Sequence, residues 1–159
     1  MSSISSLLAE QFVILPMHAT DRDSAVRELL LPLVQHHVIE SCEDCLESIL
    51  KRERRMSTGV GKGVALPHGL SDSVEDVVMV MGISPEGVDF KAVDAALCHI
   101  FVLLISPASQ PDKHLKLLSR ITKLLSDGEL RSALMETRTP EEVLETLHKW
   151  ETRKDDVLL

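Results

Sequence analysis

Residues 52–69 read RERRMSTGVGKGVALPHG: a basic stretch, then three alternating glycines, then a histidine between a proline and a glycine. Alternating glycines permit backbone angles, and a close approach of an anion, that side chains would block. Pro67 restricts the chain around it, so we expect residues 64–66 to form a short buried strand and His68 to stand at its exit. Gly69 then frees the chain to turn away.

An imidazole in this position suits a nucleophile that accepts a phosphoryl group, because nearby cations shield the incoming negative charge. Arg52, Arg54, Arg55 and Lys62 supply such cations within the same segment. A turn histidine beside a solvated basic face would explain an isolated Pro-His-Gly equally well. The length of the pattern around His68 therefore has to decide between the two interpretations.

The segment resembles the active-site signature of phosphotransferase-system (PTS) EIIA proteins of type 2, the fructose, mannitol and nitrogen-regulatory class. The family pattern is Arg-Glu, four residues, then Thr-Gly-aliphatic-Gly-x-Gly-aliphatic-Ala-aliphatic-Pro-His-Gly, and residues 52–69 fill it without a gap. The resemblance continues through residues 87–90, 100–105 and 114–118, and it covers most of the chain up to about Trp150. A match of this length favours the phosphoryl acceptor over the turn histidine.

The resemblance implies that His68 is the phosphorylated residue, with Arg52 and His114 as its partners in the site. A further set of residues is expected to support the loop and the phosphoryl group: Thr58, Gly59, Gly61, Gly63, Pro67 and Gly69. The family often shows Asp-Gly ahead of its long central strand, whereas this chain has Asp94-Ala95. We expect that difference to alter the turn there without touching the three site residues.

His114 also has a physical reason to belong to the site. It falls in the first turn of a helix expected to open near residues 109–112, where free backbone N–H groups and the helix dipole favour a neutral imidazole and a nearby anion. A boundary histidine that only caps its helix is the alternative. We predict that neutral His114 orients His68 and its phosphoryl group, while Arg52 offsets negative charge during transfer. His99, inside an apolar strand, is expected to be a hydrogen-bonded core residue.

Composition limits the class of protein. A chain of 159 residues with 44% hydrophobic content can build one domain with a real core. A net charge of −8 argues against nucleic acid, since the one dense basic cluster, residues 51–55, lies inside the signature. No stretch is long enough to span a membrane and no secretory leader is recognisable, so we expect a cytoplasmic protein without membrane insertion.

Three cysteines, an odd number, indicate free thiols in a reducing compartment. Cys42 and Cys45 form a Cys-x-x-Cys, but a zinc site would need a fourth ligand and usually a second pair. Ser41 and Asp44 instead resemble the N-cap and N3 residues of a helix, which makes both cysteines small core or boundary residues. No nucleotide-binding pattern is present either, so we expect no metal and no cofactor.

Apolar runs and capping residues alternate along the chain. Strands are expected at residues 12–15, 77–83 and 97–105. Helices are expected to begin at Thr20, at Ser41 (ending near Arg52), around residues 109–112 (with Leu115 and Leu118 in the buried stripe), at Gly128 and at Pro140. Pro32 should kink or end the first helix.

Helices flanking buried strands indicate three layers, and the resemblance implies an α/β (α+β) single-domain α/β/α sandwich with a small mixed sheet. Residues 1–150 form the expected EIIA domain, and residues 151–159 a disordered tail.

The resemblance implies a phosphocarrier, a phosphotransferase with a covalent phosphohistidine on His68. The donor would be HPr or its nitrogen-branch counterpart. The lack of a fused IIB or membrane segment favours a nitrogen-regulatory role, in which the two charge states bind a transporter or a sensor kinase. A sugar-specific IIA that passes the phosphoryl group to a IIB domain is the alternative. A binding module that is never phosphorylated is a second alternative.

Overall fold

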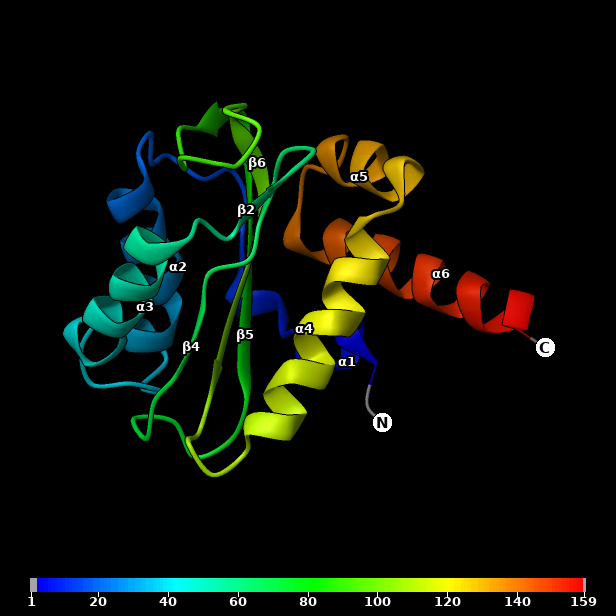
Figure 1. Ribbon diagram of the computed structural model, residues 1–159. Coiled ribbons are helices and arrows are strands. Elements are labelled where there is room, and N and C mark those ends of the chain that lie inside the picture. Colours follow the sequence, from blue (N-terminus) through cyan, green and yellow to red (C-terminus); the bar gives the residue numbers. More distant parts are fainter. Residues whose placement is uncertain (1–2, 159) are drawn as a thin grey trace.

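Helices cover both faces of one six-stranded mixed sheet (Figure 1). The computed structural model describes residues 3–158, and the side chains of residues 3–153. One face carries α2 (Arg22–Gln35) and α3 (Glu43–Arg55). The other face carries α1 (Ile4–Leu7), α4 (Pro111–Leu125), α5 (Gly128–Met135) and α6 (Pro140–Leu158). The predicted three-layer α/β/α sandwich is confirmed.

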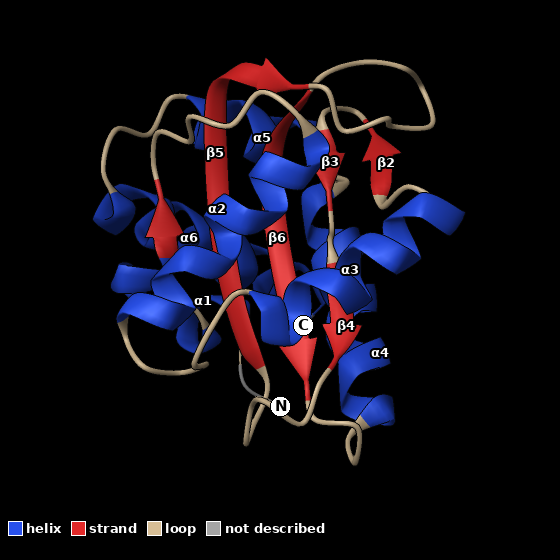
Figure 2. Cartoon of the chain, turned by 90° about the vertical axis from the view of Figure 1, so that its left-hand side faces the viewer, coloured by secondary structure: helices blue, strands red, loops and turns tan. Residues whose placement is uncertain are grey.

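The sheet has the order β1-β5-β6-β3-β2, and β4 pairs with β6 beyond the end of β3 (Figure 2). Its central pair, β5 and β6, is antiparallel, and so is the pair of β2 and β3. β1 runs parallel to β5, and β3 and β4 run parallel to β6. The strands are β1 (Val13–Ile14), β2 (Gly59–Gly61), β3 (Val64–Ala65), β4 (His68–Leu70), β5 (Val78–Val88) and β6 (Cys98–Ser106). The mixed sheet agrees with the prediction, and both central strands begin within one residue of their expected starts. β5 continues through Pro85 to Val88, five residues beyond its expected end.

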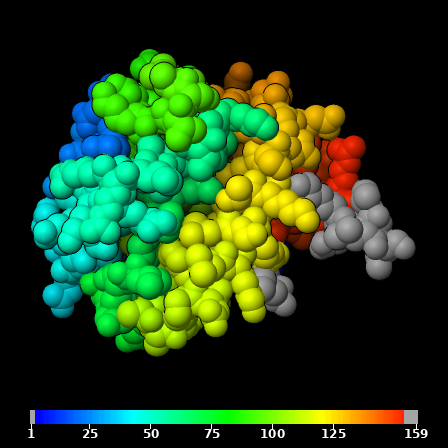
Figure 3. All heavy atoms as spheres, viewed as in Figure 1, coloured from blue at the N-terminus to red at the C-terminus, as the bar shows by residue number. Residues whose placement is uncertain are grey.

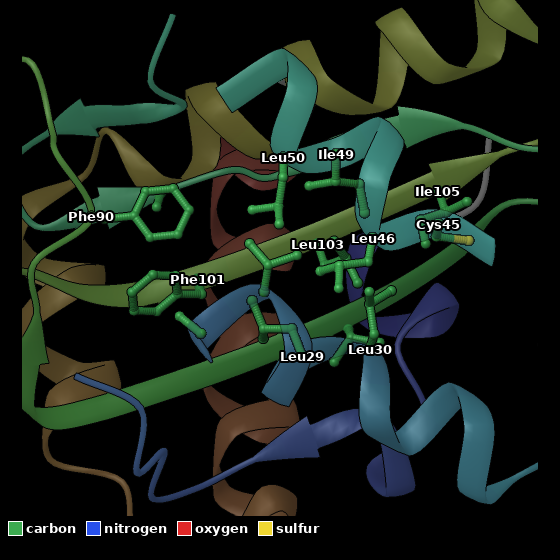
Figure 4. Close-up of a cluster of buried hydrophobic side chains, with 14 of the residues drawn as sticks. Leu29, Leu30, Cys45, Leu46, Ile49, Leu50, Phe90, Phe101, Leu103 and Ile105 are labelled. Atoms are coloured by element: carbon green, nitrogen blue, oxygen red, sulfur yellow. The ribbon is translucent and has the colours of Figure 1, made fainter. Parts of the chain in front are cut away.

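Each face of the sheet has its own apolar core, because β5 and β6 are buried on both sides. Figure 4 shows the core under α2 and α3, where Leu29 and Leu30 meet Leu46 and Ile49 above the sheet. Phe90 and Phe101 close one end of that core; their rings stack edge to face at 5.4 Å. These cores fix α3 and α4 on opposite faces of β6.

The first long helix differs from its prediction at both ends. The N-cap is Asp21, whose carboxylate accepts a hydrogen bond from the backbone N–H of Ser24, and not Thr20. Pro32 neither ends nor interrupts the helix, which continues to Gln35. Pro32 lies in the last turn and is buried, so one missing backbone donor there is offset by packing against the core.

The N-cap of α3 is Cys42, one residue later than predicted, and the helix ends at Arg55, one turn beyond the expected end at Arg52. Half of the predicted capping box is present, since the backbone N–H of Ser41 donates to Asp44. Cys45 is buried in the core shown in Figure 4 and Cys42 is partly exposed; both are free thiols, and burial raises the pKa of each. Their prediction as core and boundary residues is confirmed.

The last helix begins as predicted, because the backbone N–H of Glu142 donates to the hydroxyl of Thr139. It continues to Leu158, so the domain boundary expected at residue 150 falls inside α6. The carboxylate of Glu151 accepts hydrogen bonds from the backbone N–H groups of Ile4 and Ser5, at 2.7 and 2.8 Å. Disorder of residues 151–159 stays a prediction. Within the described part of the chain, no helix combines the length and apolar character needed to cross a membrane.

Candidate functional site

His68 opens a strand. Pro67 separates β3 from β4, but both strands pair in parallel with β6, and His68 lies opposite Leu104. His68 was expected at the exit of a strand and Gly69 in a turn; both expectations are wrong, because β4 spans the two residues. Pro67 lacks an N–H, but its carbonyl accepts from the N–H of Leu104 at 3.1 Å, so the ladder resumes at once and Gly69 stays inside β4.

One ring nitrogen of His68 is committed to the backbone. Nδ1 lies 2.7 Å from the carbonyl oxygen of Leu66. A carbonyl can only accept, so Nδ1 carries the hydrogen and Nε2 keeps a free lone pair. Burial of the half-buried ring lowers the pKa of His68, and the charge of Arg52 lowers it further, against the opposing effect of the Leu66 bond. His68 therefore presents a neutral imidazole with an unprotonated Nε2.

His114 lies beside His68, with ring centroids 5.5 Å apart and ring planes inclined by 49°. Its side chain is buried, and burial, followed by the electrostatic effects of His68 and Arg52, lowers its pKa to about 4. Nδ1 of His114 lies 2.7 Å from the hydroxyl oxygen of Ser106 at the end of β6. The prediction that the two histidines meet is thus supported by geometry, and His114 is neutral at pH 7.

The burial of His114 changes the expected face of α4. The sequence analysis placed Leu115 in the buried stripe, but Leu115 is 64% exposed, whereas His114 and Leu117 are buried. Because α4 begins at Pro111, its sheet-facing positions start with the histidine. A polar residue occupies a core position here because Ser106 supplies its partner.

An open cavity of about 510 Å³ lies next to His68. The end of α3 and the segment after it form one side and α4 forms the other, as the teal and yellow segments on the face in Figure 3 show. Its lining residues are Ser48, Lys51, Arg52, Arg55, Met56, Ser57, Thr58, Val60, Leu66, His68, Leu118 and Thr122. Arg52 and Thr58 therefore line the same cavity as His68, and the site has a basic, partly apolar rim.

Glu53 is a buried residue to which the sequence analysis gave no role. Its side chain is 2% exposed and accepts hydrogen bonds from the backbone N–H of Thr58, at 3.0 Å, and from the hydroxyl of Thr58. Burial raises the pKa of Glu53, while Thr58, Arg22 and Arg52 act in the opposite direction. Glu53 thus ties the start of the glycine segment to α3. The signal that could have shown this is an acidic residue at a core position of the helix, four residues after Ile49.

The glycines shape the hairpin between β2 and β3. A Cβ on Gly59 would lie 2.8 Å from the Cβ of Ala92, so that position admits no side chain without movement. Gly61 and Gly63 have φ angles of 93° and 78°, in the region that favours glycine. The N–H of Val93 donates to the carbonyl of Gly59 at 3.1 Å. These contacts agree with loop support; direct contact of the glycines with a phosphoryl group stays a prediction.

Ala95 stands where the family often has glycine, and its φ angle is 61°. The turn is held by Asp94, whose carboxylate accepts from the N–H groups of Lys62 and Ala96. An alanine thus adopts the backbone conformation that glycine would take, at a cost in strain. The three proposed site residues are not involved.

His99 is a hydrogen-bonded core residue as predicted, since its Nδ1 lies 2.8 Å from the carbonyl oxygen of Ser84. Among residues 3–153, no three His, Cys, Asp or Glu side chains are grouped as a metal ion would require. Of the predicted residues, the structure brings together His68, His114, Arg52 and Thr58. Glu53 and Ser106 support Thr58 and His114 in the structure, and the sequence pattern indicated neither of these contacts.

Comparison with known proteins agrees with this geometry. The family model described as "Phosphoenolpyruvate-dependent sugar phosphotransferase system, EIIA 2" matches residues 6–150. The chain is 28% identical over 146 residues to the fructose-specific EIIABC component of Bacillus subtilis, covering 92% of this chain but only 23% of that protein. It is 28% identical over 156 residues to the nitrogen regulatory protein of Escherichia coli, covering 96% of this chain and 94% of that one.

A solved structure shows the same architecture. The crystal structure of the nitrogen regulatory protein IIA-Ntr from Neisseria meningitidis superposes with a TM-score of 0.83 at 29% identity, covering 91% of this chain and 98% of that one. The likeness therefore extends over most of the fold.

Proposed function

Since this chain belongs to the EIIA 2 family of the phosphoenolpyruvate-dependent sugar phosphotransferase system, we propose that it is a phosphocarrier that takes up a phosphoryl group on His68. The single observation that carries this proposal is the bond from Nδ1 of His68 to the carbonyl of Leu66, beside a second neutral histidine. It leaves Nε2 of His68 as an unprotonated nucleophile at neutral pH.

The transfer step balances without a base. Nε2 of His68 attacks the phosphorus of a phosphohistidine on the donor, and a new N–P bond forms as the donor's N–P bond breaks. The electron pair of the broken bond stays on the donor's imidazole. The hydrogen on Nδ1 of His68 remains in its bond to Leu66, so no proton has to leave. The product is a covalent phosphohistidine on this protein.

Arg52 and His114 have different parts in this step. Arg52 shares the cavity with His68 and carries a permanent charge, so it offsets the negative charge of the phosphoryl group in transfer. His114 is neutral and lies against His68, so it acts as a hydrogen-bond partner and not as a proton source. Thr58, held by Glu53, keeps the cavity wall in place.

The donor we propose is HPr or its nitrogen-branch counterpart, in the cytoplasm. The rim of the cavity fits a protein that carries a phosphoryl group, because cationic Lys51 and Arg55 stand beside Met56, which is 76% exposed. Downstream, we propose a regulatory role in which phosphorylation changes the charge of this rim and so the choice of a target such as a transporter or a sensor kinase. The likeness to nitrogen regulatory proteins over nearly their whole length supports that role.

A sugar-specific role is the second candidate, because a fructose-specific protein is also among the relatives, although the chain spans 23% of its length. In that role His68 would pass the phosphoryl group to a IIB domain. A binding module that is never phosphorylated is a further alternative. The shared cavity of His68 and Arg52, together with the contact of His114 with His68, counts against it.

The test is the intact mass after incubation with phosphoenolpyruvate, enzyme I and HPr under mildly basic conditions that preserve phosphohistidine. We expect one phosphoryl group on the wild type, none on His68→Ala, and one on His148→Ala, which changes an exposed histidine and serves as the matched control. A phosphoryl group on His68→Ala would contradict the assignment of His68. None on the wild type, with HPr charged, would favour the binding module.

A second experiment separates the regulatory role from the sugar-specific one. The phosphorylated protein is mixed with isolated IIB domains of fructose and mannitol type, and the loss of its phosphoryl group is followed by mass. Retention with both is expected for the regulatory role. Rapid transfer to either domain would establish the sugar-specific alternative.

A further inference from the structure

The hydroxyl of Ser106 is fully buried and lies 2.7 Å from Nδ1 of His114. Ser106 is the last residue of β6, and His114 is in the first turn of α4. The short connection between them is itself closed by a hydrogen bond from the N–H of Gln110 to the carbonyl of Pro107, at 3.0 Å. Strand, connection and helix therefore hold the two side chains in a fixed relation.

The direction of this hydrogen bond follows from the partners of the serine. Its backbone carbonyl already accepts from the N–H of Ser71 at 2.8 Å. Within the described residues, the hydroxyl of Ser106 has His114 as its one hydrogen-bond partner. If Nδ1 of His114 donated, the hydroxyl hydrogen would be buried without an acceptor, which is costly. If the hydroxyl donates, every hydrogen is used and only an acceptor lone pair is left over.

A hydroxyl that donates to Nδ1 requires the hydrogen of the neutral imidazole to be on Nε2. His114 stays neutral at pH 7 because burial lowers its pKa to about 4, so the tautomer decides what the ring offers to its neighbour. A phosphoryl group on Nε2 of His68 brings anionic oxygens next to this ring, whose centroid is 5.5 Å from that of His68. Such oxygens accept hydrogen bonds, and a lone pair on Nε2 of His114 would repel them.

We propose that Ser106 is a positioning residue: it holds His114 in the Nε2–H tautomer, so that His114 donates a hydrogen bond to the phosphoryl group on His68. This inference rests on the proposed function. Ser106 touches neither donor nor phosphoryl group and acts through His114 alone. It lies outside the signature segment and outside the cavity lining.

The tautomer of the wild type is the first test. Nitrogen-15 spectra of histidine-labelled protein at neutral pH distinguish a protonated from an unprotonated ring nitrogen, and His114→Gln identifies the resonances of His114. We expect an unprotonated Nδ1 and a protonated Nε2. Protonation of Nδ1 in the wild type would overturn the inference without any serine variant.

The second test compares Ser106→Ala with Ser84→Ala. Ser84 is a matched control, because its hydroxyl is also buried and hydrogen-bonded, here to the N–H of Gly87. Ser106→Ala should give a mixture of His114 tautomers and slow phosphoryl uptake from HPr by about threefold to tenfold, the worth of one hydrogen bond. Ser84→Ala should change neither, and Ser106→Thr, which keeps the hydroxyl, should restore both.

Failure of the positioning role can be told apart from failure of the proposed phosphocarrier function. If Ser106→Ala keeps the wild-type tautomer of His114 and takes up the phosphoryl group on His68 at the wild-type rate, the positioning role is overturned and the phosphocarrier function stands. A wild type that takes up no phosphoryl group would overturn the phosphocarrier, and this inference with it.

Discussion

The two histidines of the site are held in opposite ways. His68 is half-buried, and its ring is fixed by a backbone carbonyl only two residues away. His114 is 5% exposed, and its ring is fixed by the side chain of Ser106, which belongs to another element. The orientation of the His68 ring is thus fixed by a contact within its own segment, whereas that of the His114 ring depends on the junction of β6 and α4.

Because the two rings differ in burial and in hydrogen-bond partner, they differ in the chemistry that they can perform. His68 lines the cavity, and its Nε2 has a free lone pair. A nucleophile needs both access to its substrate and an unprotonated atom. The deeper burial of His114 lowers its pKa to about 4 and removes it from proton transfer at neutral pH. In the proposed site, two residues of one type thus serve as phosphoryl acceptor and hydrogen-bond donor because their surroundings differ.

Replacing each histidine by alanine should give the largest contrast. His68→Ala removes the nucleophile, so uptake of the phosphoryl group from HPr should be lost completely. His114→Ala removes one hydrogen-bond donor, so uptake should continue at a rate lower by about 100-fold. Intact mass against time measures both, and equal loss in the two variants would refute the division of roles.

The pH dependence of stability should show the burial of His114. The unfolded chain binds this proton near pH 6.5, whereas the folded chain binds it only near pH 4. Stability is therefore complete above pH 6.5, and about 3 kcal/mol is lost as the pH falls from 6.5 to 4. His114→Gln should remove this loss in urea unfolding, while His148→Gln at an exposed position should keep it. If the free energy of unfolding of the wild type and of His114→Gln fell by the same amount between pH 6.5 and 4, the prediction would be contradicted.

The segment around His68 can be loosened through Thr58. Thr58→Val keeps the shape of the side chain but removes the hydroxyl that donates to buried Glu53, so the free energy of unfolding should fall by about 1–3 kcal/mol. Urea unfolding measures the change. Thr58→Ser keeps the donor and should lose less. A greater loss for serine than for valine would mean that packing of the methyl group, and not the hydrogen bond, holds the segment.

The smallest effect is expected at Ala95, in the turn that contacts the glycine hairpin. Glycine tolerates the φ angle of 61° that strains alanine, so Ala95→Gly should stabilise the protein by about 0.5–1 kcal/mol. Ala96→Gly is the control, because Ala96 is not among the residues with positive φ, and it should destabilise through chain entropy alone. The midpoint of thermal unfolding should move in opposite directions, and a shared direction would contradict the strain.

Local signals predicted much of the fold. The Thr139 cap, the proline at 140 and the apolar runs of β5 and β6 placed these elements correctly, because capping and burial patterns act over a few residues. The prediction failed at Pro32, where packing at the end of α2 outweighs local preference. It failed again at Leu115, where the phase of α4 is set by the burial of His114.

The sequence by itself determined the signature of residues 52–69, the short strand after its glycines and the identity of the proposed nucleophile, because these features are contiguous and obey short-range rules. Tertiary structure alone decided that His114 is buried against His68, that Ser106 contacts its Nδ1, and that Glu53 holds Thr58 from inside the core. Each of these depends on the pairing of distant strands and on which polar groups are buried together. A buried polar group must find its partner in space, and spacing along the chain does not show where that partner lies.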